Sequence, residues 1–324
     1  MIEFRVDADI AGVRLDKVLR KRLPNVPVSH LFKMIRTKKV RVNGKRAQPE
    51  QPLVEGDTVS IRGDEKQLQG TASNPFKKGA AEQPQEELDP KLLEVLYEDD
   101  WMMGVNKPSG MAVHTGSGIT GGTLVDYVRA YLGPRAVRND FAASPAHRID
   151  RETSGVILVA KRRPAMVHFT EIFTSGHPKK RYVTLVKGRM PQASGTIDLP
   201  LAEHQQTKES KDRRGVNMQN ALTRWKVLGQ AADVALLECS IETGRTHQIR
   251  RHLAALGHPV AGDRKYGDFA FNRELKNRYG LKRLFLHARS IEFPHPEDGR
   301  KVRLEAALPQ ELVAVLKQAA IETT

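Results

Sequence analysis

The sequence predicts an α+β protein with a small N-terminal domain over 1–63, a linker over 64–90 and a larger domain over 91–324. Helical periodicity and a hairpin signal occupy the first sixty residues. The stretch 64–90 lacks sustained periodicity and is rich in Gln, Glu, Pro, Gly and Ala, as linkers are. Strand-like and helical segments then mix without regular βαβ spacing, which predicts one large mixed, mainly antiparallel sheet.

Composition restricts the function. The chain has 324 residues, 39% of them hydrophobic, which is enough for a substantial core. Lys and Arg number 53 against 38 Asp and Glu, and the net charge of +15 favours a polyanionic partner. No run of about 18 apolar residues is present, and the first residues lack the layout of a signal peptide. We therefore expect nucleic acid as the partner, no membrane, and a cytoplasmic location.

Cysteine and histidine usage argues against a metal centre. The single cysteine, Cys239, excludes an internal disulfide and a cysteine-based zinc cluster. It is expected to be a small core residue. None of the histidines shows a ligand spacing that would define a zinc site. We expect no metal and no cofactor.

The small domain is predicted to hold two helices and a small sheet. A second helix is expected after Ser29, as its N-cap, through 30–39. Asn43-Gly44 between alternating residues predicts a two-residue hairpin, and a turn at Gly56-Asp57 precedes a further strand. The first helix is predicted from apolar residues that share one helical face: Leu15, Val18, Leu19 and Leu23.

Basic residues cluster on the second helix and the hairpin. Almost no acidic residues interrupt them between 29 and 46, so the cluster would neutralise several backbone phosphates at once. The alternative is a solvated charged face without a partner. The candidate RNA-binding residues are Arg14, Lys33, Arg36, Lys38, Lys39, Arg41, Lys45 and Arg46.

This region resembles a known RNA-binding module. The segments "RLDKVL", "VPVSHLFKMIRTKKVRVNGK" and "LVEGDTVSI" are similar to the S-four-type domain first recognised in a ribosomal protein of the small subunit. The similarity covers roughly residues 12 to 63. It implies RNA binding and no chemistry.

The larger domain opens with two short strands, 95–99 and 101–107, joined by a turn at Asp99-Asp100. Three further segments have the pattern of antiparallel strands, and 245–256 has that of a helix beside them. The three strand segments are 181–188, 221–229 and 233–241.

One carboxylate stands out in the stretch "AHRIDRETSGVILVAK". Asp150 lies between Arg148 and Arg151 and precedes the apolar run 155–160, which predicts a buried central strand. A carboxylate flanked by guanidinium groups stays ionised when partly desolvated and can act as a nucleophile or a base. The alternative is a structural aspartate. A glycosidase pair with Glu152 is disfavoured, because adjacency in sequence does not place two carboxyls on either side of a sugar.

Five ordered blocks then identify a family resemblance. "HRIDRETSGVILVAK" is similar to the signature of the RluA-type RNA pseudouridine synthases, whose usual form has Leu at 149 and Asp at 152. Together the blocks cover most of 91–300. The other four are "LYEDDWMMGVNKPSGMAVH", "KKRYVTLVKG", "IETGRTHQIRRHLAALGHPVAGDRKYG" and "RLFLHARSIEFPHP".

The resemblance implies isomerisation of uridine to pseudouridine in RNA, without cofactor or metal. Asp150 would be the essential carboxylate, and attack on carbon or abstraction of a proton both stay open. Arg250 would pair with Asp150, and Ile249 would pack against the reacting base. Tyr182 would stack on the uracil and assist proton transfer at C5, while Arg148 would fill the space left by the extruded nucleotide.

The expected substrate is RNA, with 23S large-subunit ribosomal RNA implied by the branch of the family that the chain resembles most. Two alternatives stay open: a pseudouridine synthase acting on transfer RNA, and a non-catalytic RNA-binding protein of ribosome assembly. We expect a monomer without an obligate protein partner.

Overall fold

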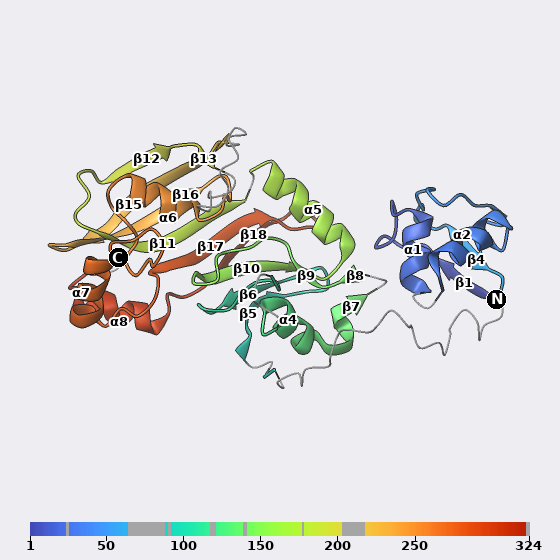
Figure 1. Ribbon diagram of the computed structural model, residues 1–324, viewed down its shortest axis with the longest axis horizontal. Helices are drawn as coiled ribbons and strands as arrows, with labels where there is room; N and C mark the ends of the chain where they lie inside the picture. Colours follow the sequence, from blue (N-terminus) through green and yellow to red (C-terminus); the bar gives the residue numbers. More distant parts are fainter. Residues whose placement is uncertain are drawn as a thin grey trace.

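Figure 1 shows the computed structural model, which describes residues 1–23, 26–63, 88–89, 92–116, 121–138, 141–176, 178–202 and 218–321. The predicted linker, 64–90, lies outside the described residues apart from Leu88 and Asp89. In the part of the chain that is described, no helix is both long enough and apolar enough to cross a membrane.

The small domain combines a four-stranded sheet of order β1-β4-β2-β3 with two helices. Apolar residues of both helices and of the strands form one core, in which Leu15, Leu19, Leu31, Ile35 and Val59 are all buried. The elements are β1 (Ile2–Arg5), α1 (Leu15–Arg22), α2 (Val28–Arg36), β2 (Val40–Val42), β3 (Lys45–Arg46) and β4 (Thr58–Ile61).

The predicted hairpin is confirmed, and the predicted cap is wrong. Asn43 and Gly44 both have positive φ, 51° and 71°, as a tight two-residue turn between β2 and β3 requires. α2 starts one residue before Ser29, because Pro27 with φ −55° is its N-cap. The helix ends at Arg36 rather than 39, since Lys38 adopts a left-handed φ of 63°.

The larger domain is built on one ten-stranded sheet of order β12-β15-β16-β11-β17-β10-β6-β5, with β18 paired to β17 and β9 to β10 (Figure 1). All its pairs are antiparallel except β10 with β17, so the predicted mixed, mainly antiparallel sheet is confirmed. Its strands are β5 (Glu94–Glu98), β6 (Met102–Lys107), β9 (Ser144–Pro145), β10 (Ser154–Ala160), β11 (Lys179–Lys187), β12 (Ser194–Asp198), β15 (Leu222–Gln230), β16 (Val234–Ile241), β17 (Leu286–Pro294) and β18 (Lys301–Glu305).

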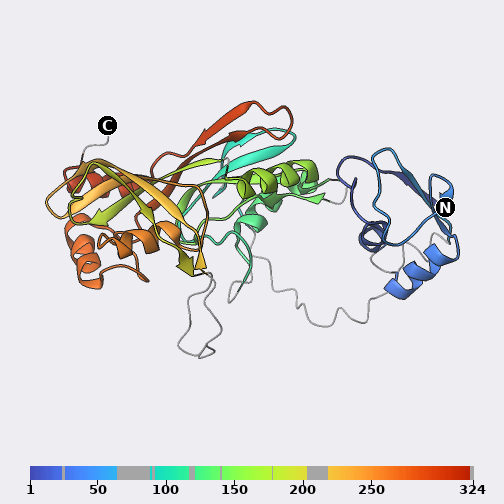
Figure 2. The same ribbon diagram turned by 90° about the horizontal axis from the view of Figure 1, so that it is seen from above.

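Helices cover both faces of this sheet (Figure 2). Apolar residues of α4 and α6 join one core cluster, those of α5 join a second, and those of α7 and α8 join a third. Two small ribbons, β7-β8 and β13-β14, lie outside the main sheet. The remaining elements are α4 (Leu124–Leu132), η2 (Gly133–Ala136), β7 (Val137–Arg138), β8 (Phe141–Ala142), α5 (Arg163–Thr174), β13 (Leu201–Ala202), β14 (Met218–Gln219), α6 (Gln248–Ala255), α7 (Phe269–Tyr279) and α8 (Gln310–Gln318).

β10 is the central strand that the apolar run predicted. All its residues are buried, because alternate side chains such as Ile157 and Leu158 enter core clusters on opposite faces of the sheet. Gly155 has φ 117°, and a Cβ there would lie 2.2 Å from the carbonyl oxygen of Ala288 on β17. This close approach fixes the beginning of β10 against β17 and thereby the turn that precedes it, which carries Asp150.

Candidate active site

Asp150 lies in the turn that leads into β10. Its side chain is 23% exposed, so one side of the carboxylate is open to a substrate while the other contacts protein. The amide of Thr153 donates to the carbonyl of Asp150 at 3.1 Å and closes the turn.

A buried lysine clamps this turn to the loop after β6. Lys107 is fully buried, and its ammonium donates to the carbonyl oxygens of Pro108 and Met111, each at 2.8 Å, and of Arg151 at 3.0 Å. The backbone of Gly110 and the main and side chains of Arg151 add two further bonds between the same segments. Burial, and then the charge of Arg283, lower the pKa of Lys107 to about 7, while the charges of Glu152 and Asp150 favour its charged form.

Arg250 joins two carboxylates with one guanidinium. Its Nη1 donates to Oδ2 of Asp150 at 3.0 Å, while Nε and Nη2 donate to the two oxygens of Asp263 at 2.7 and 2.9 Å. The arginine side chain is 9% exposed and that of Asp263 is fully buried. The bidentate contact with Asp263 fixes the plane of the guanidinium, and the remaining nitrogen is left to orient Asp150.

Electrostatic interactions keep Arg250 and Asp263 ionised. Burial by itself would lower the pKa of Arg250, but the hydrogen bonds to Asp263 and Asp150 outweigh it, and the net pKa is raised. Burial would likewise raise the pKa of Asp263. The bond from Arg250 and the backbone amides of Tyr266 and Lys265 instead hold that pKa below its usual value.

The first turn of α6 places Arg250 and Ile249. His247 precedes the helix with a left-handed φ of 54°, which delays the helix to Gln248 rather than the predicted 245. Gln248 is buried, and its side-chain amide donates to the carbonyl of Leu222 at 2.9 Å, which attaches the helix to the sheet. Ile249 is 4% exposed and belongs to the main core cluster.

Tyr182 enters the same cluster from β11. It pairs with Cys239 on one side and Ala288 on the other, and it is 8% exposed. Burial, and then the charge of Asp150, raise the pKa of the Tyr182 phenol. The phenol is therefore close enough to Asp150 for the charge of the carboxylate to affect its pKa, and it stays protonated. Cys239 is buried, which confirms the expectation that it is a small core residue.

Arg148 lies two residues before Asp150 and is exposed. Within the described part of the chain, no hydrogen bond or ion pair involves its side chain. Burial, and then the charge of Arg148, lower the pKa of His114, which places the arginine near the segment after β6. Arg148 is thus an exposed cation that does not take part in the Asp150–Arg250 pair.

The sequence predicted no role for four residues that lie at the site. Besides Lys107 and Asp263, they are His247, whose Nε2 lies 3.8 Å from Oδ2 of Asp150, and Tyr266, whose hydroxyl lies 2.8 Å from Nδ1 of His247. Burial lowers the pKa of His247. All four lie inside the quoted sequence blocks, but nothing in their spacing distinguishes them there, and only the fold shows that they converge.

The arrangement suits a reaction with a single carboxylate. Asp150 is partly exposed. Around it lie the fixed guanidinium of Arg250, the buried phenol of Tyr182 and the apolar side chains of the core cluster. Asp263, the carboxylate that shares Arg250, is fully buried and engaged by Arg250 and two backbone amides. It cannot serve as the second carboxyl of a glycoside hydrolase, which has to reach the substrate.

Comparison with known proteins identifies the family. Residues 102–255 match the family model for RNA pseudouridylate synthase, and residues 13–59 match the S4 domain. "Ribosomal large subunit pseudouridine synthase C" of Escherichia coli (strain K12) is 39% identical over 97% of this chain and 95% of its own length. The chain belongs to the RNA pseudouridine synthases. It is therefore an isomerase with an S4 RNA-binding domain in front of the catalytic fold, as the sequence blocks predicted.

Further relatives agree. The protein of the same name from Vibrio cholerae is 37% identical over 96% of this chain and 94% of its own length. Among solved structures, "Human RNA Pseudouridylate Synthase Domain Containing 4" superposes with a TM-score of 0.60 and 26% identity, covering 72% of this chain and 96% of that one. The synthase fold is thus shared by sequence and by structure.

Replacing Lys107 with methionine tests the clamp on the Asp150 turn. The substitution leaves three part-buried carbonyl oxygens without their shared donor, and among the described residues only that of Arg151 keeps another, the amide of Gly110, so we expect the larger domain to lose about 3 kcal/mol of stability. Both tryptophans, Trp101 and Trp225, lie in this domain, so urea unfolding followed by tryptophan fluorescence reports on it directly. Lys301→Met, at a 70% exposed lysine of β18, is the matched control and should change stability by less than about 1 kcal/mol. Equal losses in the two variants would contradict the clamp.

The raised pKa of Tyr182 leads to a prediction about how the single-turnover rate depends on pH. Because burial and the charge of Asp150 hold its pKa above the ordinary 10.0, the phenol stays protonated throughout the range below pH 10. Single-turnover rates of the native enzyme and of Tyr182→Phe should therefore run parallel with pH up to that point. A limb with a midpoint below pH 10 that disappears in the phenylalanine variant would show that Tyr182 ionises in the working range.

Proposed function

We propose that this pseudouridine synthase isomerises specific uridines of 23S large-subunit ribosomal RNA. The observation that supports this target is the near full-length similarity to proteins named for the large ribosomal subunit, which extends through both domains. Transfer RNA is the alternative substrate. We also propose that the protein acts as a monomer in the cytoplasm, where ribosomal RNA is made in the bacteria that these relatives come from.

Asp150 is proposed as the essential carboxylate, and its ion pair with Arg250 is the observation that supports the role. In the overall reaction the C1′–N1 bond breaks, the uracil turns, and a C1′–C5 bond forms. C5 loses a proton and N1 gains one, so the reaction needs no cofactor. A carboxylate that is hydrogen-bonded to Arg250 and partly open to a substrate suits either attack on the ribose or removal of that proton.

The other roles follow from position. Tyr182 and Ile249 lie in one apolar cluster beside Asp150, where a flat uracil ring would be covered. Because Tyr182 stays protonated, it is suited to donate a hydrogen bond or a proton rather than to act as a phenolate base. Arg148 is exposed and has no side-chain partner among the described residues, which suits a side chain that replaces an extruded nucleotide in the RNA.

The small domain, 1–63, is proposed to hold the RNA while the larger domain, 91–324, performs the chemistry, with 64–90 as their linker. Such tethering raises the local concentration of substrate at the catalytic site. Arg14 differs from the other basic candidates, because Asp16 at 3.0 Å and Glu50 at 3.4 Å engage its guanidinium. The candidates without a carboxylate partner among the described residues are Lys33, Arg36, Lys38, Lys39, Arg41, Lys45 and Arg46.

Pseudouridine mapping tests the activity, the target and the carboxylate together. Unmodified 23S ribosomal RNA and transfer RNA are incubated with the protein, labelled chemically at pseudouridine and examined for reverse-transcription stops. We expect new stops on 23S RNA with the native protein and none with Asp150→Ala, which should still bind the RNA. Stops only on transfer RNA would overturn the proposed target, and unchanged stops with Asp150→Ala would overturn the proposed role of Asp150.

A further inference from the structure

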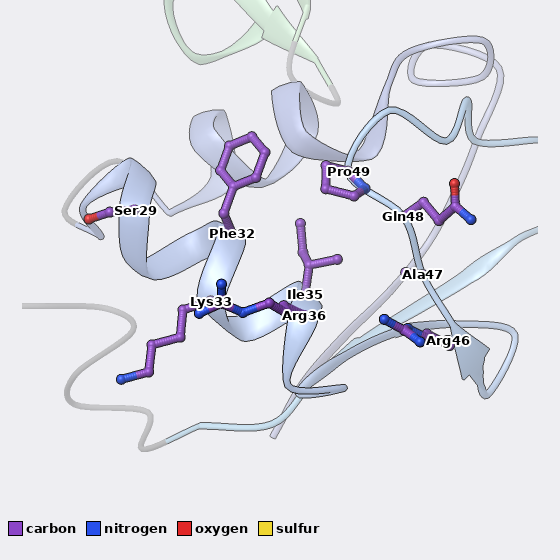
Figure 3. Close-up of a pocket in the computed structure, with 9 residues that line it drawn as sticks. All are labelled: Ser29, Phe32, Lys33, Ile35, Arg36, Arg46, Ala47, Gln48 and Pro49. Atoms are coloured by element: carbon purple, nitrogen blue, oxygen red, sulfur yellow. The ribbon is translucent and has the colours of Figure 1, made fainter.

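An open depression lies on the small domain, between α2 and the segment that follows β3 (Figure 3). Its volume is about 540 Å³, within the range of roughly 300–1,000 Å³ that is usual for sites that hold small molecules. It is lined by residues of 29–36 and 46–49, none of which belongs to the catalytic domain. The depression is therefore a feature of the RNA-binding domain alone.

The floor of the depression is apolar and rigid. Ile35 and Ala47 are 1% and 2% exposed and belong to the core of the small domain, so the floor cannot easily shift. Phe32 is only half-buried, and Figure 3 shows its ring at the edge of the space, across from Pro49. The guanidinium of Arg20 lies 5.6 Å from the centroid of the Phe32 ring. A half-open aromatic ring on a basic surface offers a platform on which a nucleobase can stack.

The rim is cationic. Lys33 and Arg36 come from α2, and Arg46 comes from the end of β3, and all three are exposed. In the described part of the chain none of them pairs with a carboxylate, and the sequence has no acidic residue between 26 and 49. The rim therefore presents three positive charges that no carboxylate of the described residues compensates, around an apolar floor.

An apolar floor with an aromatic ring at its edge, below a cationic rim, fits a nucleotide, whose base is planar and whose phosphates are anionic. The bases of a continuous duplex are covered by their neighbours in the stack, so a duplex would reach the rim but leave the floor empty. An acidic peptide would also use the rim, but it has no planar group for the floor. A nucleotide that is not stacked in a helix uses both.

We propose that this depression binds an unpaired base of the RNA, stacked on Phe32, with the neighbouring phosphates on Lys33, Arg36 and Arg46. The inference rests on the proposed function, in which the small domain contacts RNA. It adds that the small domain selects RNA at a position where a base projects from a stem, and not merely a charged backbone.

The test compares two labelled RNA hairpins that differ only in one unpaired adenosine, bound to the full-length protein at fixed salt. Adenosine is chosen because the catalytic site cannot isomerise it. Fluorescence anisotropy should show the bulged hairpin bound about tenfold more tightly than the continuous one. Phe32→Leu keeps apolar volume but removes the aromatic face, so it should abolish the difference and leave the affinity for the continuous hairpin within about twofold.

Phe4→Leu is the matched control. Phe4 lies on β1 with the guanidinium of Arg22 at 3.9 Å from its ring centroid, so it is also an aromatic residue of the small domain beside an arginine, but it does not line the depression. The control should leave both affinities unchanged. Thermal melting of each variant confirms that the small domain is folded.

The outcomes separate this inference from the function on which it rests. Arg36→Gln should weaken binding of both hairpins and reduce the salt dependence by about one phosphate contact. If it affects neither hairpin, the small domain does not hold the RNA, and the proposed division of labour fails. If Arg36→Gln weakens both hairpins but the native protein binds them equally, or Phe32→Leu weakens both to the same extent, the base-binding depression is wrong. Displacement of the bulged hairpin by poly-glutamate as readily as by unlabelled bulged hairpin would point instead to an acidic peptide and overturn the assignment.

Discussion

The site depends on the hydrogen bonds that the guanidinium of Arg250 makes to two carboxylates. Two of its nitrogens are committed to Asp263, which is fully buried, and one is left for Asp150, which is partly open to solvent. A buried arginine with only one carboxylate would leave donors unpaired at considerable cost. With both carboxylates present, Asp150, Arg250 and Asp263 form a triad in which every nitrogen of the guanidinium has an acceptor.

The rest of the larger domain serves to place the two ends of this triad. Asp150 is fixed from one side by the Lys107 clamp and by the close approach of Gly155 to β17. Asp263 is fixed from the other by Gly262, whose Cβ, if present, would lie 2.0 Å from the carbonyl oxygen of Arg283. Both glycines have positive φ, and a side chain at either would push the corresponding carboxylate away from Arg250.

Local patterns were sufficient for the features that depend on neighbouring residues. The Asn43-Gly44 hairpin, the buried strand after Asp150 and the antiparallel strands at 181–188 and 233–241 follow from turn chemistry and periodicity, and the structure confirms them. Position-by-position similarity to a family also indicated that Arg250 would meet Asp150, across 100 residues of chain. The cap at Ser29 was wrong, because Pro27 sets the backbone of the first turn more strongly than a serine side chain does.

Other features created by tertiary contacts could not be predicted from local patterns. Asp263 and Tyr266 have no periodic or motif signal that distinguishes a buried partner of Arg250 from a surface turn. Lys107 ends a strand, where a lysine is ordinarily exposed, and only its three carbonyl acceptors explain its complete burial. Such residues gain their role from groups that are distant in sequence, so composition and spacing do not reveal them.

A double-mutant cycle tests whether Asp263 acts on the reaction through Arg250. Single-turnover rates at saturating RNA would be measured for Asp263→Asn, Arg250→Met and the double variant, with the fold of each checked by tryptophan fluorescence. We expect Asp263→Asn to slow the native enzyme about tenfold or more but to slow the Arg250→Met enzyme by less than about twofold, because the group that Asp263 positions is already absent. Equal slowing in both backgrounds would show that Asp263 acts independently of Arg250.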